Sequence, residues 1–285
     1  MLAGNSQKSG DRIIEMDPTI AKNLLDRARE RCETEPFLQP ASIEPHGVLI
    51  ACSEDDWQIH QLSANAGERL GRTLESLPGQ SLSGVLPPED MATLHRALAE
   101  GNRGPLSLTA KLHWPQPTAD SGCHACLHRA DGLLILELEP RLLAPTQLPA
   151  LHTRMLRVIE RLNQSADLDS LYGTAATELR GLCGVDQVAV FRFGIDGHGS
   201  VVAEDRAPTM PAYLDLRFPA SDVPQQVRRH AVQQAIRMTP DVCAEAVALV
   251  PARNPRTGKP LDQARCQLRS AHPRASRYYQ NMGVR

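Results

Sequence analysis

Hydrophobic and polar positions in the first half of the chain follow a mainly two-residue period. Residues 47–52 form a continuous apolar run, and residues 57–62 alternate, so both segments predict strands. Helices are predicted next, at residues 64–70 and 89–98, followed by strands at 106–113, 123–128 and 133–138. Strands, then helices, then strands again indicate an α+β domain built on an antiparallel sheet.

The second half begins after a stretch that contains three prolines, residues 140–149, which is the best candidate for a linker. Apolar residues at helical spacing predict one helix starting near residue 150 and a second at 167–183. Two strands are expected at 187–193 and 201–204, joined by a turn at 196–199, and a helix at 224–238. Near the N-terminus, Asp17-Pro18 predicts the start of a short helix that ends before Cys32.

Composition limits the class of protein. A length of 285 residues favours roughly two domains. The net charge of -2 gives no electrostatic reason to expect binding to nucleic acid or to a membrane surface. We find no apolar run of the ~20 residues that cross a bilayer and no signal peptide. The seven cysteines, an odd number, favour reduced thiols and a cytoplasmic location over a disulfide framework.

Several short motifs occur together in a specific order. They are Cys32, Ile-Glu-Pro-His-Gly at 43–47, Pro-Ala-Ser-Asp-Val-Pro at 219–224, Leu-Arg-Ser at 268–270 and Asn-Met-Gly-Val at 281–284. No single motif is decisive, but through their joint order the chain resembles the N-terminal photosensory region of a bacterial phytochrome. The resemblance covers about residues 30–285.

The resemblance implies an α+β fold in which a PAS domain precedes a GAF domain. Residues 1–36 would form an N-terminal tail with a short helix, residues 37–142 the PAS domain and residues 150–285 the GAF domain. We expect this GAF domain to lack its C-terminal strands, because the family's GAF sheet continues beyond the matching position. In the family, the segment before the PAS domain passes through a loop of the GAF domain and forms a knot, an arrangement that is rare in proteins.

The resemblance also implies a ligand, the linear tetrapyrrole biliverdin. Cys32 matches the bacterial attachment cysteine, whose thiolate adds to a vinyl group of the bilin and forms a thioether. The alternative for Cys32 is a free surface cysteine. Arg274 occupies the position of the plant-type attachment cysteine, so that chemistry is excluded.

Three charged residues match positions that hold the bilin in the family. Asp222 would accept hydrogen bonds beside the pyrrole nitrogens, although an aspartate before Pro224 and a helix is also a common cap. Arg237 and Arg269 would hold the two propionates by paired hydrogen bonds, although each alone could be an ordinary surface arginine.

The remaining residues that the resemblance places in the pocket are Ser221, Val223, Pro224, Phe191, Phe218 and Tyr278. For the three aromatic residues, an ordinary GAF core is the alternative. Phe191 replaces a usual tyrosine, and Ala231 and Ala275 replace a tyrosine and the pocket histidine. His272 is three residues before Ala275, so we do not expect it to take over that role.

One segment has the residue types of a metal site, Cys123-His-Ala-Cys-Leu-His128. On a strand, successive side chains point to opposite faces, so Cys123 and Cys126 would be separated. A plain PAS strand and no metal are therefore the preferred interpretation. We find no nucleophile elbow, phosphate-binding loop or metalloprotease motif, so we expect no enzyme activity in this chain.

Two functions remain open. The first is a red/far-red photoreceptor that binds biliverdin and passes a light signal to an output domain or partner protein, with homodimerisation possible. The second is a PAS–GAF interaction or dimerisation module that has lost bilin binding. Cys32, Asp222 and the two arginines favour the first, whereas Ala231, Ala275 and the short GAF domain favour the second. Any kinase output would lie outside this sequence.

Overall fold

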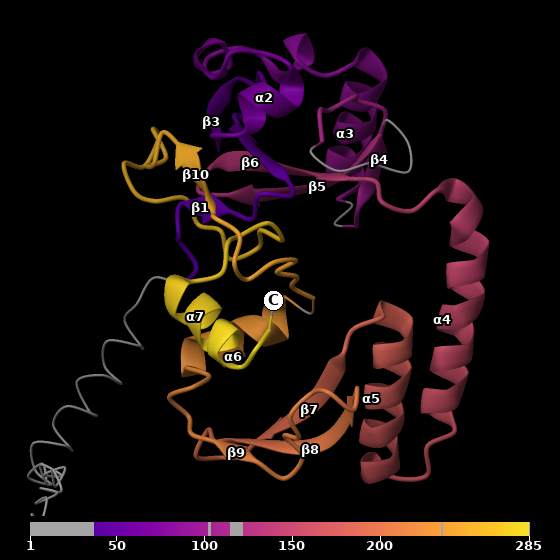
Figure 1. Ribbon diagram of the computed structural model, residues 1–285. Helices are drawn as coiled ribbons and strands as arrows, with labels where there is room; N and C mark the ends of the chain where they lie inside the picture. The colour runs from indigo at the N-terminus through magenta and orange to yellow at the C-terminus, as the bar shows by residue number, and fades with distance from the viewer. Residues whose placement is uncertain (1–36, 102–103, 115–121, 235, 285) are drawn as a thin grey trace, which may run out of the picture.

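The computed structural model describes residues 37–101, 104–114, 122–234 and 236–284, arranged around two β-sheets (Figure 1). The predicted helix at 17–31 and Cys32 lie outside the described residues. Among the described residues, no helix is long and apolar enough to cross a membrane.

The first sheet has seven antiparallel strands in the order β1-β10-β3-β2-β6-β5-β4. They span Ser42–Ile43 (β1), Val48–Cys52 (β2), Ile59–Ser63 (β3), Leu106–Leu108 (β4), Cys123–Ala130 (β5), Leu133–Pro140 (β6) and Val247–Val250 (β10). The apolar run of β2 is buried on both faces, whereas β5 alternates between buried and half-buried residues. These burial patterns match the continuous and alternating patterns in the sequence.

Helices α2, Ala66–Leu70, and α3, Pro88–Glu100, lie on one side of the first sheet (Figure 1). Two short 3-10 helices, Leu74–Ser76 and Leu82–Gly84, connect them. The predicted strand at 106–113 ends early, at Leu108. The reason is Asp90 of α3, whose buried carboxylate accepts hydrogen bonds from the backbone of Thr109 and Ala110 at 2.7 Å each.

The other face of this sheet is covered by a segment from much later in the chain. Strand β10 pairs with β3 and with β1, and its Leu249 N donates to Ala41 O at 2.9 Å. On its other side, the segment that contains β1 is bound by Glu44 N donating to Leu268 O at 2.7 Å. Residues 38–44 therefore lie between two stretches of the later segment, as the predicted passage through a GAF loop requires.

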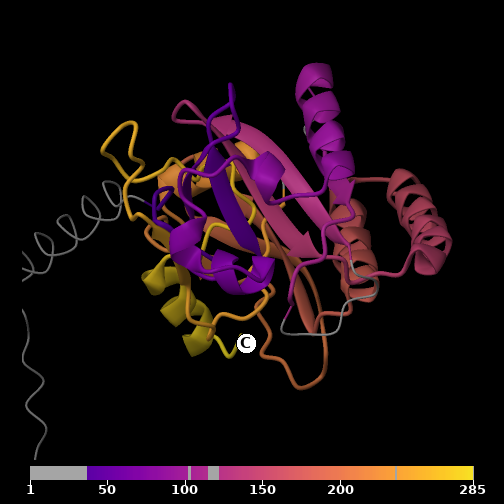
Figure 2. The same ribbon diagram turned by 90° about the horizontal axis from the view of Figure 1, so that it is seen from above.

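The second sheet has the order β7-β8-β9, with strands Gln187–Phe193, Gly199–Arg206 and Arg217–Phe218. Helix α5, Leu168–Cys183, packs against β7 and β8, and α4, Leu148–Asn163, lies beside α5 (Figure 1). Asp167 caps α5 in a reciprocal capping box with Ser170, as an N-cap aspartate does. Seen from above, α4 lies at the side of the molecule remote from α7 (Figure 2).

Along the chain, helix α6, Gln225–Gln233, precedes the segment that contributes β10 to the first sheet, and helix α7, Pro273–Asn281, follows it. The predicted helix at 224–238 is too long, because the backbone is extended at Gln234 (φ -118°, ψ 97°). The side chain of Gln234 donates to Cys266 O at 3.2 Å and contacts His230 at 2.8 Å. These contacts hold the end of α6 against Cys266, which lies on the segment that returns from the first sheet to α7. The helix therefore ends where the chain turns towards the first sheet.

Candidate functional site

A carboxylate and a phenol meet between α6 and α7. Asp222 lies in the turn before α6, where its N–H donates to Pro219 O at 3.0 Å. Tyr278 of α7 donates its hydroxyl hydrogen to Asp222 Oδ2 at 3.3 Å, and Ser221 Oγ donates to Asp222 Oδ1 at 3.4 Å. Burial raises the pKa of Tyr278, and the charge of Asp222 and this hydrogen bond raise it further.

Aromatic rings extend this contact towards the second sheet. The rings of Phe191 on β7 and Phe218 on β9 are 5.3 Å apart between centroids. Tyr213 lies edge-on to Phe218 at 6.5 Å, and its hydroxyl donates to Met282 O at 3.5 Å, just beyond α7. Ring pairs at these distances stabilise each other beyond the area they bury.

The two arginines of the sequence prediction also lie together. Arg237 Nη2 donates to the backbone oxygen of Arg269 at 3.2 Å. Arg269 is only 3% exposed, and its Nη1 donates to Phe37 O at 2.8 Å, at the first described residue. Burial, followed by the neighbouring charge of Arg237, lowers the pKa of Arg269 to about 10.

The hydrogen-bonding capacity of Arg269 is not filled. Its Nε is buried and has no hydrogen-bond partner among the described residues. A buried guanidinium with an unused donor is costly unless an acceptor reaches it. The two adjacent cations therefore form a place where an anionic group would be stabilised.

Glu44 is a buried acid whose charge interacts with Arg237 of this pair. It is 4% exposed, and its Oε1 accepts a hydrogen bond from Ala271 N at 3.0 Å. Burial raises the pKa of Glu44, while Ala271 and the charge of Arg237 oppose that shift. Glu44 therefore compensates the arginine pair only in part.

The sequence departs from the family pattern at Ala231 and around residues 272–275, and the structure shows where these residues lie. Ala231 is exposed on α6 and lines a cavity of about 570 Å³, together with Val223 and Phe193. Ala275 is half-buried on α7, three residues before Tyr278 and therefore on the same helix face. His272 caps α7, its Nδ1 accepting from Arg274 N at 3.3 Å, so it does not replace a histidine at 275.

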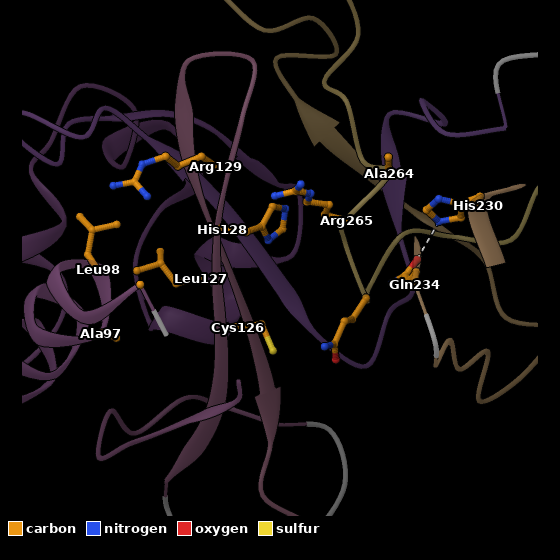
Figure 3. A pocket seen from close by; sticks show the side chains of 12 residues that line it. Ala97, Leu98, Cys126, Leu127, His128, Arg129, His230, Gln234, Ala264 and Arg265 are labelled. Carbon is orange, nitrogen blue, oxygen red and sulfur yellow. Dashed lines mark hydrogen bonds between the residues drawn. The ribbon is translucent and has the colours of Figure 1, made fainter. Parts of the chain in front are cut away.

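A larger cavity, of about 740 Å³, lies between β5, the end of α3 and residues 264–267 (Figure 3). Cys126, His128 and His230 are among its lining residues. His128 also belongs to a cluster with the buried residues Glu137 and Cys266, whose possible ligand atoms are all within 4.8 Å of one another.

The cluster is tightly bonded. Cys266 Sγ is 3.6 Å from His128 Nε2, and Glu137 accepts from Gln267 N at 3.1 Å and Leu268 N at 2.8 Å. Burial, which disfavours the charged form of each group, raises the pKa of Glu137 to about 7 and lowers that of His128 to about 4. Burial also raises the pKa of the Cys266 thiol well above its ordinary value.

The structure thus brings together the predicted residues in three contacts: Asp222 with Ser221 and Tyr278, Phe191 with Phe218, and Arg237 with Arg269. Val223 and Pro224 flank the turn and the start of α6. Sequence reasoning did not single out Tyr213, Glu44 or Cys266. The only signals for them were a scarce tyrosine (four in the chain), a motif acid and an isolated cysteine.

Comparisons with known proteins support the sequence interpretation. A family model described as a PAS fold matches residues 32–141. The phytochrome-like protein Cph1 of Synechocystis is 36% identical over 266 residues, covering 92% of this chain and 35% of that protein. A bacteriophytochrome of Pseudomonas aeruginosa is 33% identical over 255 residues, covering 89% of this chain and 34% of that protein. The chain therefore spans about a third of the length of these relatives.

Solved structures agree with these relatives. The chromophore-binding domain of an unusual bacteriophytochrome, RpBphP3 from R. palustris, superposes with a TM-score of 0.79 at 35% identity, covering 88% of this chain and 81% of that one. The chromophore-binding domain of Stigmatella aurantiaca phytochrome P1 gives 0.76 at 34% identity, covering 89% and 83%. The predicted α+β fold, a PAS domain followed by a GAF domain, is confirmed.

Proposed function

This chain belongs to the bacteriophytochrome family, and on that premise we propose that it is a photosensory module that binds a linear tetrapyrrole, biliverdin. The observation that carries the proposal is the unfilled arginine pair. Arg269 is buried with an unpartnered Nε, and Arg237 is exposed beside it. Two propionate groups of a bilin are anions of the right kind for these two guanidinium groups.

Asp222 and the rings around it would hold the tetrapyrrole itself. The Asp222 carboxylate accepts hydrogen bonds and would orient the pyrrole N–H groups and stabilise a protonated bilin. Phe191, Phe218 and Tyr278 would supply aromatic surface, with Ser221, Val223 and Pro224 along the turn. Tyr278 already donates to Asp222, so the phenol would keep the carboxylate in place.

Cys32 would attach the bilin through a thioether. Cys32 itself lies outside the described residues, but Phe37 is bound to Arg269 through its carbonyl oxygen. Five residues of extended chain reach at most about 17 Å, so the thiol is confined to the neighbourhood of the arginine pair. This tether favours Cys32 over the other cysteines as the attachment point.

The bilin, when bound, would supply light absorption and isomerisation. The chain's own residues would hold its propionates, orient its nitrogens and pass a change in these contacts to α6 and α7. We propose that an output domain or a partner protein receives this signal, and that a homodimer is the signalling unit.

The arginine pair gives a direct test. The bilin-free chain is titrated with biliverdin, and the red absorption band reports binding. Arg269→Met combined with Arg237→Met should weaken binding roughly 100-fold or more, since each of the two charged hydrogen bonds contributes about 1.5–3 kcal/mol. Arg253→Met, an exposed arginine bonded to Gly258 O, is the matched control and should leave binding unchanged. Absence of a red band with the unaltered chain would contradict the proposal.

A further inference from the structure

We propose that His128, Glu137 and Cys266 bind a divalent metal ion of the zinc class in the seam between the first sheet and residues 261–268. The inference does not require bilin binding, because none of these three residues is among those proposed to hold the bilin. It begins from the cysteine–histidine segment of β5, whose alternation separates its two cysteines and favoured a plain strand.

The spacing of the donor atoms suits tetrahedral coordination. A tetrahedral zinc ion with bonds of about 2.3 Å to sulfur and 2.0 Å to nitrogen holds those two atoms roughly 3.5 Å apart. Cys266 Sγ and His128 Nε2 are 3.6 Å apart. A carboxylate oxygen of Glu137 completes a set in which all donors lie within 4.8 Å of one another.

The donors are held by three different elements. His128 is on β5, Glu137 is on the neighbouring strand β6, and Cys266 is on the segment that returns from α6. The oxygens of Glu137 are fixed by the backbone N–H groups of Gln267 and Leu268. Hydrogen bonds that orient a ligating carboxylate in this way are typical of metal sites.

Charge also favours a cation. Glu137 is 2% exposed and Cys266 is fully buried, so a carboxylate and a thiolate here would be costly without a counter-charge. A divalent ion would cancel both charges at once. Arg265, the neighbouring cation, is exposed, and the charge of Asp262 opposes its effect on His128.

The cavity of about 740 Å³ supplies a path to the site (Figure 3). Cys126 and His128 project from the same side of β5 towards the segment that carries Arg265 (Figure 3). Cys126 lies directly opposite Glu137 in the strand register but is outside the group of donors within 4.8 Å of one another, so an exogenous ligand such as water would complete the coordination. The ion would fasten the returning segment to the first sheet.

The test uses the full, bilin-free, reduced chain with Cys32→Ser, Cys183→Ser and Cys243→Ser, which remove the tail thiol and the two exposed thiols. Co²⁺ is the probe, because a cobalt–thiolate bond gives a charge-transfer band in the near ultraviolet. We expect one equivalent of Co²⁺ to give this band and Zn²⁺ to displace it. A chain that shows no band would overturn the proposal.

Variants then assign the donors. Cys266→Ser should abolish the band, and His128→Gln should weaken zinc binding about tenfold or more, whereas His124→Gln on the same strand should change neither. His128 is half-buried, so this variant serves if Cys266→Ser does not fold, as judged by circular dichroism. A band that survives in both variants would show that the cluster is only a thiol–imidazole hydrogen bond.

Discussion

At the scale of single residues, Arg269 connects regions that are far apart in sequence. Its side chain donates to Phe37 O, its backbone oxygen accepts from Arg237, and its backbone bridges to Ile43. One residue therefore ties the N-terminal segment to the candidate bilin site. The unpartnered Nε shows that these contacts leave room for one more acceptor.

Asp222 and Tyr278 give a prediction about pH. Burial raises the pKa of Tyr278 above its ordinary value, and Asp222 adds to the shift by its charge and by accepting the phenol hydrogen. A phenol whose pKa is raised by folding stabilises the fold below pH ~10, and this contribution is lost as the pH rises through the folded-state pKa. Asp222→Asn should therefore lower the pKa of Tyr278.

The measurement is an ultraviolet titration of tyrosinate on the bilin-free chain. Tyr278→Phe identifies the contribution of Tyr278 among the four tyrosines. Asp215→Asn, an aspartate outside this contact, is the matched control. A titration of Tyr278 that is the same with and without the Asp222 charge would show that the two side chains do not interact in solution.

At the scale of elements, the periodicity of the sequence was sufficient for most strands of five or more residues, but it missed the two-residue strand β9 and overextended β4. Strands β2, β5 and β6 and helix α5 lie where the patterns predicted them. Strand β10 was missed because it has only four residues and pairs with β1 and β3, about 200 residues earlier. Its apolar run has no local partner, so no local pattern marks it as part of the first sheet.

The same distinction between local and distant contacts applies to the residues of the candidate site. The motif around Asp222 marked its own turn, because a cap and a proline leave a local signature. Cys266 contacts His128 although the two residues are 138 positions apart in the sequence. Sequence spacing cannot show that contact, and so the cysteine–histidine segment of β5 looked like a strand without further ligands.

Strand β10 itself can be tested by a matched pair of substitutions. Leu249 is 1% exposed and packs in a hydrophobic cluster with Ile43 and Leu268, whereas Val250 on the same strand is 36% exposed. Leu249→Ala should lower the free energy of unfolding by about 2–5 kcal/mol, because it leaves a cavity in a packed core. Val250→Ala should cost less than about 1 kcal/mol.

Urea unfolding followed by circular dichroism measures both variants. Equal losses for Leu249→Ala and Val250→Ala would mean that β10 does not pack on the first sheet in solution. A loss confined to Leu249→Ala supports the packing of β10 beside residues 38–44 on the first sheet.

At the scale of the whole molecule, the two sheets are joined by one long segment rather than by the linker alone. The chain leaves the second sheet after α6, contributes β10 and Cys266 to the first sheet, and returns as α7 (Figure 1). Residues 38–44 are bound from both sides along this path. The first described residues are thereby held beside Arg269 of the arginine pair.

The most direct test of the bilin-binding account is pigment retention after denaturation. The chain is produced in cells that make biliverdin, purified and denatured, and the bilin that stays on the polypeptide is measured, with Cys32→Ser alongside and Cys183→Ser as the control. We predict that pigment remains on the unaltered chain and on Cys183→Ser and leaves Cys32→Ser. A chain that carries no pigment before or after denaturation would contradict the account.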